Sequence, residues 1–185
     1  MSGSPPVSGR GRRARVAARL TPTISRVILR CTGKVLAVLR TPKPSPVEVS
    51  AQDWYANLLW IERRKCLLLT HAATVFSVFV PDVRAAELRP PEPLVVARIH
   101  DALRAENLPS TTLGPLDDQN VTVAPTADRQ ILGTMNDHAV LIDHIVAADG
   151  GLARCDLDVL HHGLHRTINS VTGYVPPIEL VTATT

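Results

Sequence analysis

The sequence predicts an α+β fold, in which a small, mostly antiparallel sheet packs against three or four helices behind a disordered basic N-terminal arm. β-rich apolar runs cluster between residues 54 and 80. Two longer segments, 90–109 and 128–148, repeat apolar residues at the three- and four-residue steps of a helix. Residues 1–24 are rich in Ser, Gly, Pro and Arg, a composition that buries too little apolar surface to fold. We therefore expect an arm over residues 1–24 and one α+β domain over residues 25–185.

The first ordered elements are short. "RVILRCT" predicts a strand, and Thr32 is placed to cap a helix in "GKVLAVLR". In that helix Val35, Leu36 and Leu39 share a face. "TPKPSP" follows, and its three prolines predict an extended linker.

The clearest β signal is a hairpin. The apolar runs Leu58–Ile61 and Cys66–Leu69 flank Glu62-Arg63-Arg64, a spacing typical of two strands joined by a short polar loop. "ATVFSVFV" predicts a third strand after a second turn. Because these runs are apolar without alternation, we expect the strands to be covered on both faces.

Helices dominate the second half of the chain. Pro93 and Pro109 mark the first turn and the end of a helix, and "NVTVAPT" predicts a short strand after it. The final helix, "DLDVLHHGLHRTI", should turn Leu157, Leu160, Leu164 and Ile168 inward, and "NSVTGYVPP" reads as a turn-rich tail.

The longest helix begins in "DRQILGTMNDHA". Apolar residues at helical spacing predict one buried face over residues 128–148, formed by Leu132, Met135, Ala139, Ile142 and Val146. Gly133 would then lie inside the helix, where a glycine costs up to about 1 kcal/mol relative to alanine. We expect close contact with a neighbouring backbone to explain it.

Composition excludes several classes of protein. Three widely spaced cysteines without a C-x-x-C pair argue against a disulfide framework or a zinc knuckle and favour a reducing, cytoplasmic compartment. No apolar run reaches the roughly 18 residues that span a bilayer, so no membrane role is expected. Six aromatic side chains are too few for a base-stacking surface.

The net charge of +3 hides an asymmetry along the chain. Residues 1–43 carry ten Lys/Arg and no acid, whereas residues 44–185 carry ten basic and seventeen acidic residues, a net charge of −7. A basic arm on an acidic body is typical of polyanion binding, and a solvated tail without a role is the alternative. The candidate polyanion-binding residues are Arg10, Arg12, Arg13, Arg15 and Arg19 in the arm, with Arg63, Arg64 and Lys65 at the hairpin tip.

Three stretches occur together in a telling order: "WYANLLWIERRKCLLL", "TADRQILGTMND", and a Leu-rich helix followed by "INSVTGYVPP". As a set they resemble an uncharacterised bacterial domain family with W-x-A-N-L, R-R-K and L-G-x-M-N-D motifs. The resemblance extends roughly from Val27 to Pro177. It implies a fold, domain boundaries and a bacterial source, but no activity.

A metal site is the first chemical hypothesis. His161, His162 and His165 form H-H-x-x-H, and on a helix the first and last of them share a face, as zinc-ligating histidines do. No glutamate lies between them to act as a general base. The alternative is a histidine cluster that faces solvent near the end of a helix, where the helix dipole favours it.

A polar cluster is the second hypothesis. Arg129 could hold an anion at a helix N-terminus, next to Asp128 and on the side of Asn136, Asp137 and His138. The alternative is a capping aspartate with solvent-exposed neighbours.

The sequence as a whole leans away from catalysis. We expect a non-enzymatic interaction module that binds protein or nucleic acid, without a cofactor and with an oligomeric state that the sequence does not define. The alternative is a small metal-dependent hydrolase that holds a divalent metal on the His161/His165 helix.

Overall fold

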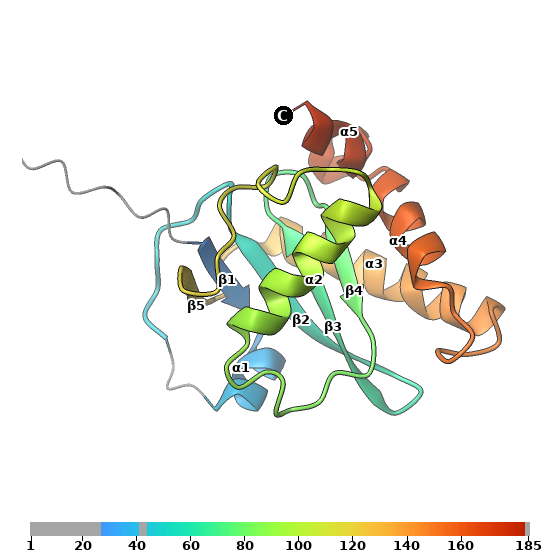
Figure 1. Ribbon diagram of the computed structural model, residues 1–185, viewed down its shortest axis with the longest axis horizontal. Coiled ribbons are helices and arrows are strands. Elements are labelled where there is room, and N and C mark those ends of the chain that lie inside the picture. The colour runs from blue at the N-terminus through green and yellow to red at the C-terminus, as the bar shows by residue number, and fades with distance from the viewer. Residues whose placement is uncertain (1–26, 41–43, 184–185) are drawn as a thin grey trace, which may run out of the picture.

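The computed structural model describes residues 27–40 and 44–183 of the chain. Within them the predicted α+β class is confirmed, with one sheet and helices on both of its faces (Figure 1). The arm expected at residues 1–24, including its five arginines, lies outside the described residues.

The sheet is mixed. Its strands are β1 (Val27–Cys31), β2 (Trp54–Ile61), β3 (Arg64–His71), β4 (Ser77–Val80) and β5 (Val121–Pro125), in the spatial order β4-β3-β2-β1-β5. β2, β3 and β4 form the antiparallel meander that the sequence predicts, whereas β1 pairs in parallel with both β2 and β5. The parallel pairs arise because long crossovers, and not tight turns, connect these strands along the chain.

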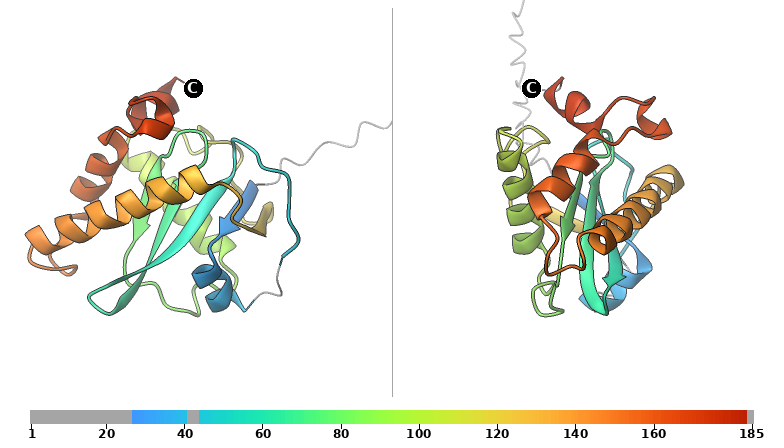
Figure 2. Two further views of the ribbon diagram at one scale, coloured as in Figure 1. Left: turned by 180° about the vertical axis from the view of Figure 1, so that it is seen from behind. Right: turned by 90° about the vertical axis from the view of Figure 1, so that its right-hand side faces the viewer.

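The helices of the described residues are α1 (Gly33–Leu39), α2 (Glu92–Ala105), α3 (Arg129–Ala148), α4 (Leu157–Arg166) and α5 (Pro177–Thr182), with a 3-10 turn η1 (Ser170–Thr172). α2 covers one face of the sheet and α3 the other (Figure 2). α5 was not expected, since a turn-rich tail was predicted there; Pro177 starts it and Val181 is buried. Among the described residues no helix is long and apolar enough to cross a bilayer.

Alternating side chains divide the core into two layers. On β2, Trp54, Ala56 and Leu58 pack in the layer of α1 and α2, whereas Tyr55 packs in the layer of α3 and α4. On β3, Leu67 packs in the layer of α1 and α2, whereas its neighbours Cys66 and Leu68 pack in the layer of α3 and α4. The expectation that these apolar runs are covered on both faces is therefore confirmed.

The hairpin tip has a tight two-residue turn. Glu62 and Arg63 have φ of 48° and 64° and connect β2 to β3, the left-handed geometry of a type I′ turn. The Glu62 carboxylate accepts the Leu152 backbone N–H at 3.2 Å, which ties the hairpin to the loop after α3.

The expectation about Gly133 in α3 is wrong, and the predicted buried face is confirmed in part. Gly133 is exposed, and a Cβ built on it would meet nothing within 4 Å, so backbone packing does not explain it. Of the predicted face, Met135, Ile142 and Val146 are buried, whereas Leu132 and Ala139 are only half-buried. The other buried residues of α3 are Ile131, Thr134 and His138. On α4, Leu160 and Leu164 are buried as expected, but Ile168 follows the helix and is 56% exposed.

A buried ion pair joins β1 to the residue that precedes β2. The Arg30 side chain of β1 donates its Nε–H to Asp53, and its Nη2 donates to the backbone carbonyls of Val47 and Glu48. The Ser50 N–H donates to the same aspartate. Residues 47–50 are thereby held by the side chains of Arg30 and Asp53.

Candidate functional site

The three histidines of the H-H-x-x-H motif face different surroundings. His165 is fully buried, His161 is half-buried, and His162 is exposed. The first two lie on the side of α4 that contacts β4, with their rings stacked at 5.9 Å between centroids. The shared face of His161 and His165 is confirmed, but it points at the sheet and not at solvent.

Both rings bind the backbone of β4 along its outer edge. His161 Nε2 lies 2.9 Å from the Phe79 N, so the Phe79 N–H donates to it. His165 Nε2 lies 2.9 Å from the Ser77 carbonyl oxygen. β4 is the edge strand on this side of the sheet. The two imidazoles therefore bind backbone groups that would otherwise be open to pairing with a further strand.

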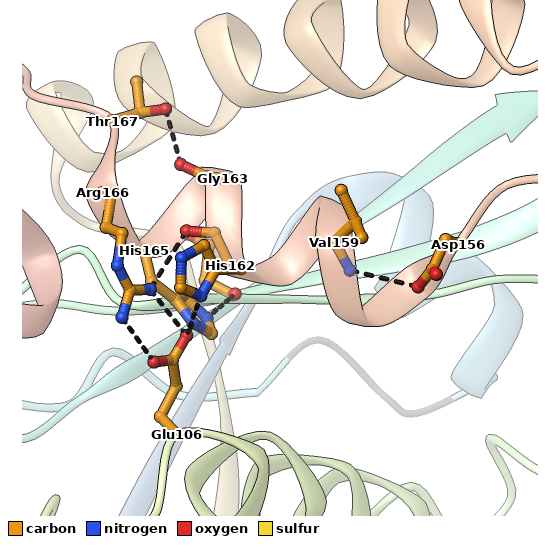
Figure 3. A network of polar contacts seen from close by, with 9 residues as sticks. Glu106, Asp156, Val159, His162, Gly163, His165, Arg166 and Thr167 are labelled. Atoms are coloured by element: carbon orange, nitrogen blue, oxygen red, sulfur yellow. Dashed lines mark hydrogen bonds and ion pairs between the residues drawn. The ribbon is translucent and has the colours of Figure 1, made fainter.

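His165 is further held by a charged pair (Figure 3). Its Nδ1 lies 2.9 Å from Glu106 Oε1, and Arg166 binds the same carboxylate through both terminal nitrogens at 2.9 Å. The hydrogen bonds from Arg166 are the largest cause that lowers the pKa of Glu106 to about 2. Burial opposes this shift, and His165 adds to it. Burial lowers the pKa of His165 to about 4.

This geometry does not resemble a metal centre. Both ring nitrogens of His165 have protein partners, and Nε2 of His161 is used by the backbone. No group of three or more His, Cys, Asp and Glu side chains within residues 27–40 and 44–183 is arranged to hold a metal ion.

The structure separates the second predicted cluster. Asp128 is the N-cap of α3 and accepts from the N–H groups of Gln130 and Ile131, which is the capping alternative. Arg129, Asn136 and Asp137 are exposed, whereas His138 is 2% exposed and turned toward the sheet. The five residues therefore do not form one site.

His138 ends a buried chain of polar contacts. Its Nδ1 lies 3.0 Å from Ser77 Oγ, which also lies 2.8 Å from Thr70 Oγ1 and 3.0 Å from the Val75 carbonyl oxygen. Burial lowers the pKa of His138 to about 4, so the ring is neutral at pH 7. Its other nitrogen, Nε2, is buried without a hydrogen-bond partner.

A pocket of about 340 Å³ lies beside this ring, between α3 and residues 167–174. Its lining residues are Thr134, Asp137, His138, Leu141, Thr167, Ile168, Asn169, Ser170 and Tyr174. Two stretches quoted above, "TADRQILGTMND" and "INSVTGYVPP", thus meet at one place although they are distant along the chain.

Asn169 supplies a second unpaired polar atom in the pocket wall. Its Oδ1 caps η1 by accepting the Thr172 N–H at 3.2 Å, which fixes the orientation of the amide. Its Nδ2 is buried and has no hydrogen-bond partner. A buried polar group without a partner costs roughly 1–3 kcal/mol, and two residues that line this pocket each carry one.

Another hollow, of about 240 Å³, lies between α2, α4 and β4. Its rim includes His161, Arg98 and Asp101, and its floor is largely apolar. His161 is already bound to β4 on its sheet side. We therefore place the candidate site at His138 and Asn169.

Sequence reasoning had named His138 and Asp137 but not Asn169, Ser77 or Glu106. The signal for Asn169 was its position before the turn "SVTG", where an asparagine side chain caps the backbone. Glu106 is the C-cap of α2, and its side chain is only 9% exposed. Its partners on α4 are 59 and 60 residues away, and no local pattern indicates them.

The basic hairpin tip is partly engaged. Lys65 lies over the Trp60 ring at 5.5 Å, and Arg64 pairs with Asp82 at 3.7 Å across an exposed surface. Arg63, the third residue of the tip, is exposed in the turn itself.

A comparison with protein families places the chain. The family model of a domain of unknown function, DUF6933, matches residues 28–180. This range agrees with the resemblance from Val27 to Pro177. Among curated proteins none matches the chain.

Proposed function

Because the chain belongs to the DUF6933 family of domains of unknown function, we propose its role from the pocket itself: a non-enzymatic module that binds a partner protein. A small polar group of the partner would enter the pocket between α3 and residues 167–174. There it would contact His138 and Asn169.

One observation carries this proposal. His138 and Asn169 both line one pocket, and each carries a buried side-chain nitrogen without a hydrogen-bond partner, Nε2 and Nδ2 respectively. A partner group that pairs with both atoms recovers the hydrogen bonds that folding removed from water. Binding is favoured over catalysis because Ser77, the hydroxyl next to His138, is fully buried and already contacts Val75 and Thr70.

Charge favours a protein partner over nucleic acid at this site. Asp137 lies in the pocket lining, and no lysine or arginine is among the lining residues. A phosphate would meet this carboxylate without a cation to neutralise it, whereas phosphate contacts dominate nucleic-acid affinity.

Nuclear magnetic resonance on the ¹⁵N-labelled full chain tests the proposal. We would add acetamide, methylammonium and acetate separately and follow the amides of Thr134, Thr167 and Ser170. Saturable shifts are expected for at least one probe. A Ser170→Trp variant, which fills the pocket from its exposed side, should abolish them.

Val140→Trp is the matched control, because Val140 is 58% exposed on α3 and outside the pocket lining. It should bind the probe like the wild type. If none of the three probes moves the lining residues, the proposal is wrong.

A further inference from the structure

The hydroxyl of Ser77 fixes which nitrogen of His138 carries the proton. A serine hydroxyl has one proton and two lone pairs. The Val75 carbonyl, 3.0 Å away, can only accept, so we assign the Ser77 proton to it, and the Thr70 hydroxyl, 2.8 Å away, then donates to Ser77. Ser77 must then accept from His138, and in the neutral ring the proton lies on Nδ1.

His138 Nε2 is therefore a hydrogen-bond acceptor. The low pKa of the ring keeps this lone pair free at neutral pH. A ligand atom opposite Nε2 must carry a proton to donate. A carboxylate or carbonyl oxygen placed there would be repelled, because its lone pairs would face the lone pair of His138 Nε2.

Asn169 has the opposite polarity. Its Oδ1 is occupied by the Thr172 N–H and lies 3.4 Å from the Thr172 hydroxyl, so the unpaired Nδ2 is the amide's donor. Two residues of the pocket lining thus carry one unpaired acceptor and one unpaired donor. A complementary group needs an N–H and a carbonyl as near neighbours.

The remaining lining limits the charge of that group. Asp137 disfavours anions, and the neutral His138 supplies no positive charge to attract them. Thr134 and Thr167 donate their hydroxyls to backbone carbonyls within their own elements, at 3.3 and 2.9 Å. Tyr174, 67% exposed at φ 63°, adds an aromatic ring to the lining.

We propose that the pocket selects a neutral amide: a peptide bond or a carboxamide side chain of the partner, its N–H donating to His138 Nε2 and its carbonyl accepting from Asn169 Nδ2. This inference rests on the proposed function, since it names the group that the pocket binds. The pocket would therefore recognise a peptide ligand by the hydrogen-bonding groups of its amide and not by its charge.

Acetamide and acetate form a matched pair for the test, because they have nearly the same size and differ in hydrogen-bond polarity and charge. Each is titrated to about 0.2 M, since so small a ligand binds weakly. We expect acetamide to saturate and to bind at least tenfold more tightly than acetate. The ¹⁵N resonance of His138 Nε2 should move with it as the lone pair accepts a proton.

Asn169→Asp removes the donor but keeps an oxygen to cap η1. It should weaken acetamide binding at least tenfold. Asn136→Asp is the same chemical change at an exposed position of α3 outside the pocket lining, and it should leave binding as in the wild type. Thermal midpoints of both variants show that any loss is not unfolding.

The outcomes separate the two proposals. Binding of acetate or methylammonium more tightly than acetamide overturns the amide inference and leaves a binding pocket. Unchanged acetamide binding in Asn169→Asp also overturns it. If none of the three probes binds, or if the free protein shows a direct hydrogen bond from Asn169 Nδ2 to His138 Nε2, both proposals are wrong.

Discussion

Arg30 and Asp53 form an ion pair inside the sheet, with the arginine Nε 2.5 Å from Oδ2 and side chains only 1% and 2% exposed. Breaking a buried pair leaves one charge without compensation and typically costs about 3–5 kcal/mol. We therefore predict that Asp53→Ala lowers the free energy of unfolding by several kcal/mol in urea melts.

The control for that variant is Asp101→Ala. Asp101 pairs with Arg98 and Arg104 on an exposed surface of α2, where such pairs contribute about 0–1 kcal/mol. If the two variants shift the urea midpoint equally, the ion pair is not a major source of stability.

At Gly133 we predict a gain in stability. The residue is exposed on α3 and has open space around its missing Cβ, so Gly133→Ala should stabilise the protein by about 0.5–1 kcal/mol through helix propensity. Gly151→Ala should do the opposite, because φ is 113° and a Cβ would lie 2.6 Å from Glu62 Oε1. Thermal melts that rank the two variants the other way would contradict this reading of the backbone.

Acid should destabilise the protein before its carboxylates titrate. Burial lowers the pKa values of His71 and His138 to about 4, below the ordinary value of 6.5. The unfolded chain then binds more protons, so stability is fully present above about pH 7 and declines as the pH falls from 6.5 toward 4.

Each of these histidines contributes up to about 1.4 kcal/mol per pH unit in that window. Urea midpoints measured at half-unit steps from pH 8 to pH 4 should show the decline. His138→Gln should flatten it, and His144→Gln should not, because His144 is exposed on α3. A profile that is flat down to pH 4.5 would refute the assignment.

His165 and His162 should differ sharply although they lie three residues apart. His165→Ala removes a ring that stacks on Phe76 at 3.8 Å and binds Ser77 and Glu106, and we expect a loss of about 2 kcal/mol or more. His162 is 63% exposed, and His162→Ala should change stability by less than about 0.5 kcal/mol.

A metal-uptake experiment addresses the metal hypothesis. We expect chelator-treated protein to take up no stoichiometric zinc or manganese. Uptake that disappears in His161→Ala would instead revive the metal-dependent hydrolase.

The basic arm gives a prediction that depends on the sequence alone. If Arg10, Arg12, Arg13, Arg15 and Arg19 bind polyanions, log affinity for duplex DNA should fall with log salt at a slope of about −4 to −5, near −0.9 for each phosphate neutralised. Deleting residues 1–24 should abolish binding and keep the thermal midpoint. Equal affinity without the arm, measured by fluorescence anisotropy, would move the binding to Arg63, Arg64 and Lys65.

The fold was accessible from sequence where the pattern is local. The hairpin follows from two apolar runs around Glu62-Arg63-Arg64, and α3 follows from its period and its capping Asp128. The parallel pairing of β1 with β5 joins residues about 95 apart, and no local signal encodes it.

Only part of the candidate site could be predicted from the sequence, for the same reason. His138 was grouped with solvent-facing neighbours because Asn136 and Asp137 are polar, yet helical rotation by one further residue turns it to Ser77. Asn169 and Ser77 are 31 and 61 positions away from it, so their meeting depends on tertiary packing.

The imidazoles along β4 also affect how molecules of this protein meet one another. A bare edge strand is a template on which a second chain can add, which is how swapped dimers and fibrils begin. Here the Phe79 N–H and the Ser77 carbonyl are bound by rings from α4. Loss of these rings would expose the backbone groups of β4 to pairing with a second chain. The double variant His161→Ala/His165→Ala should therefore aggregate.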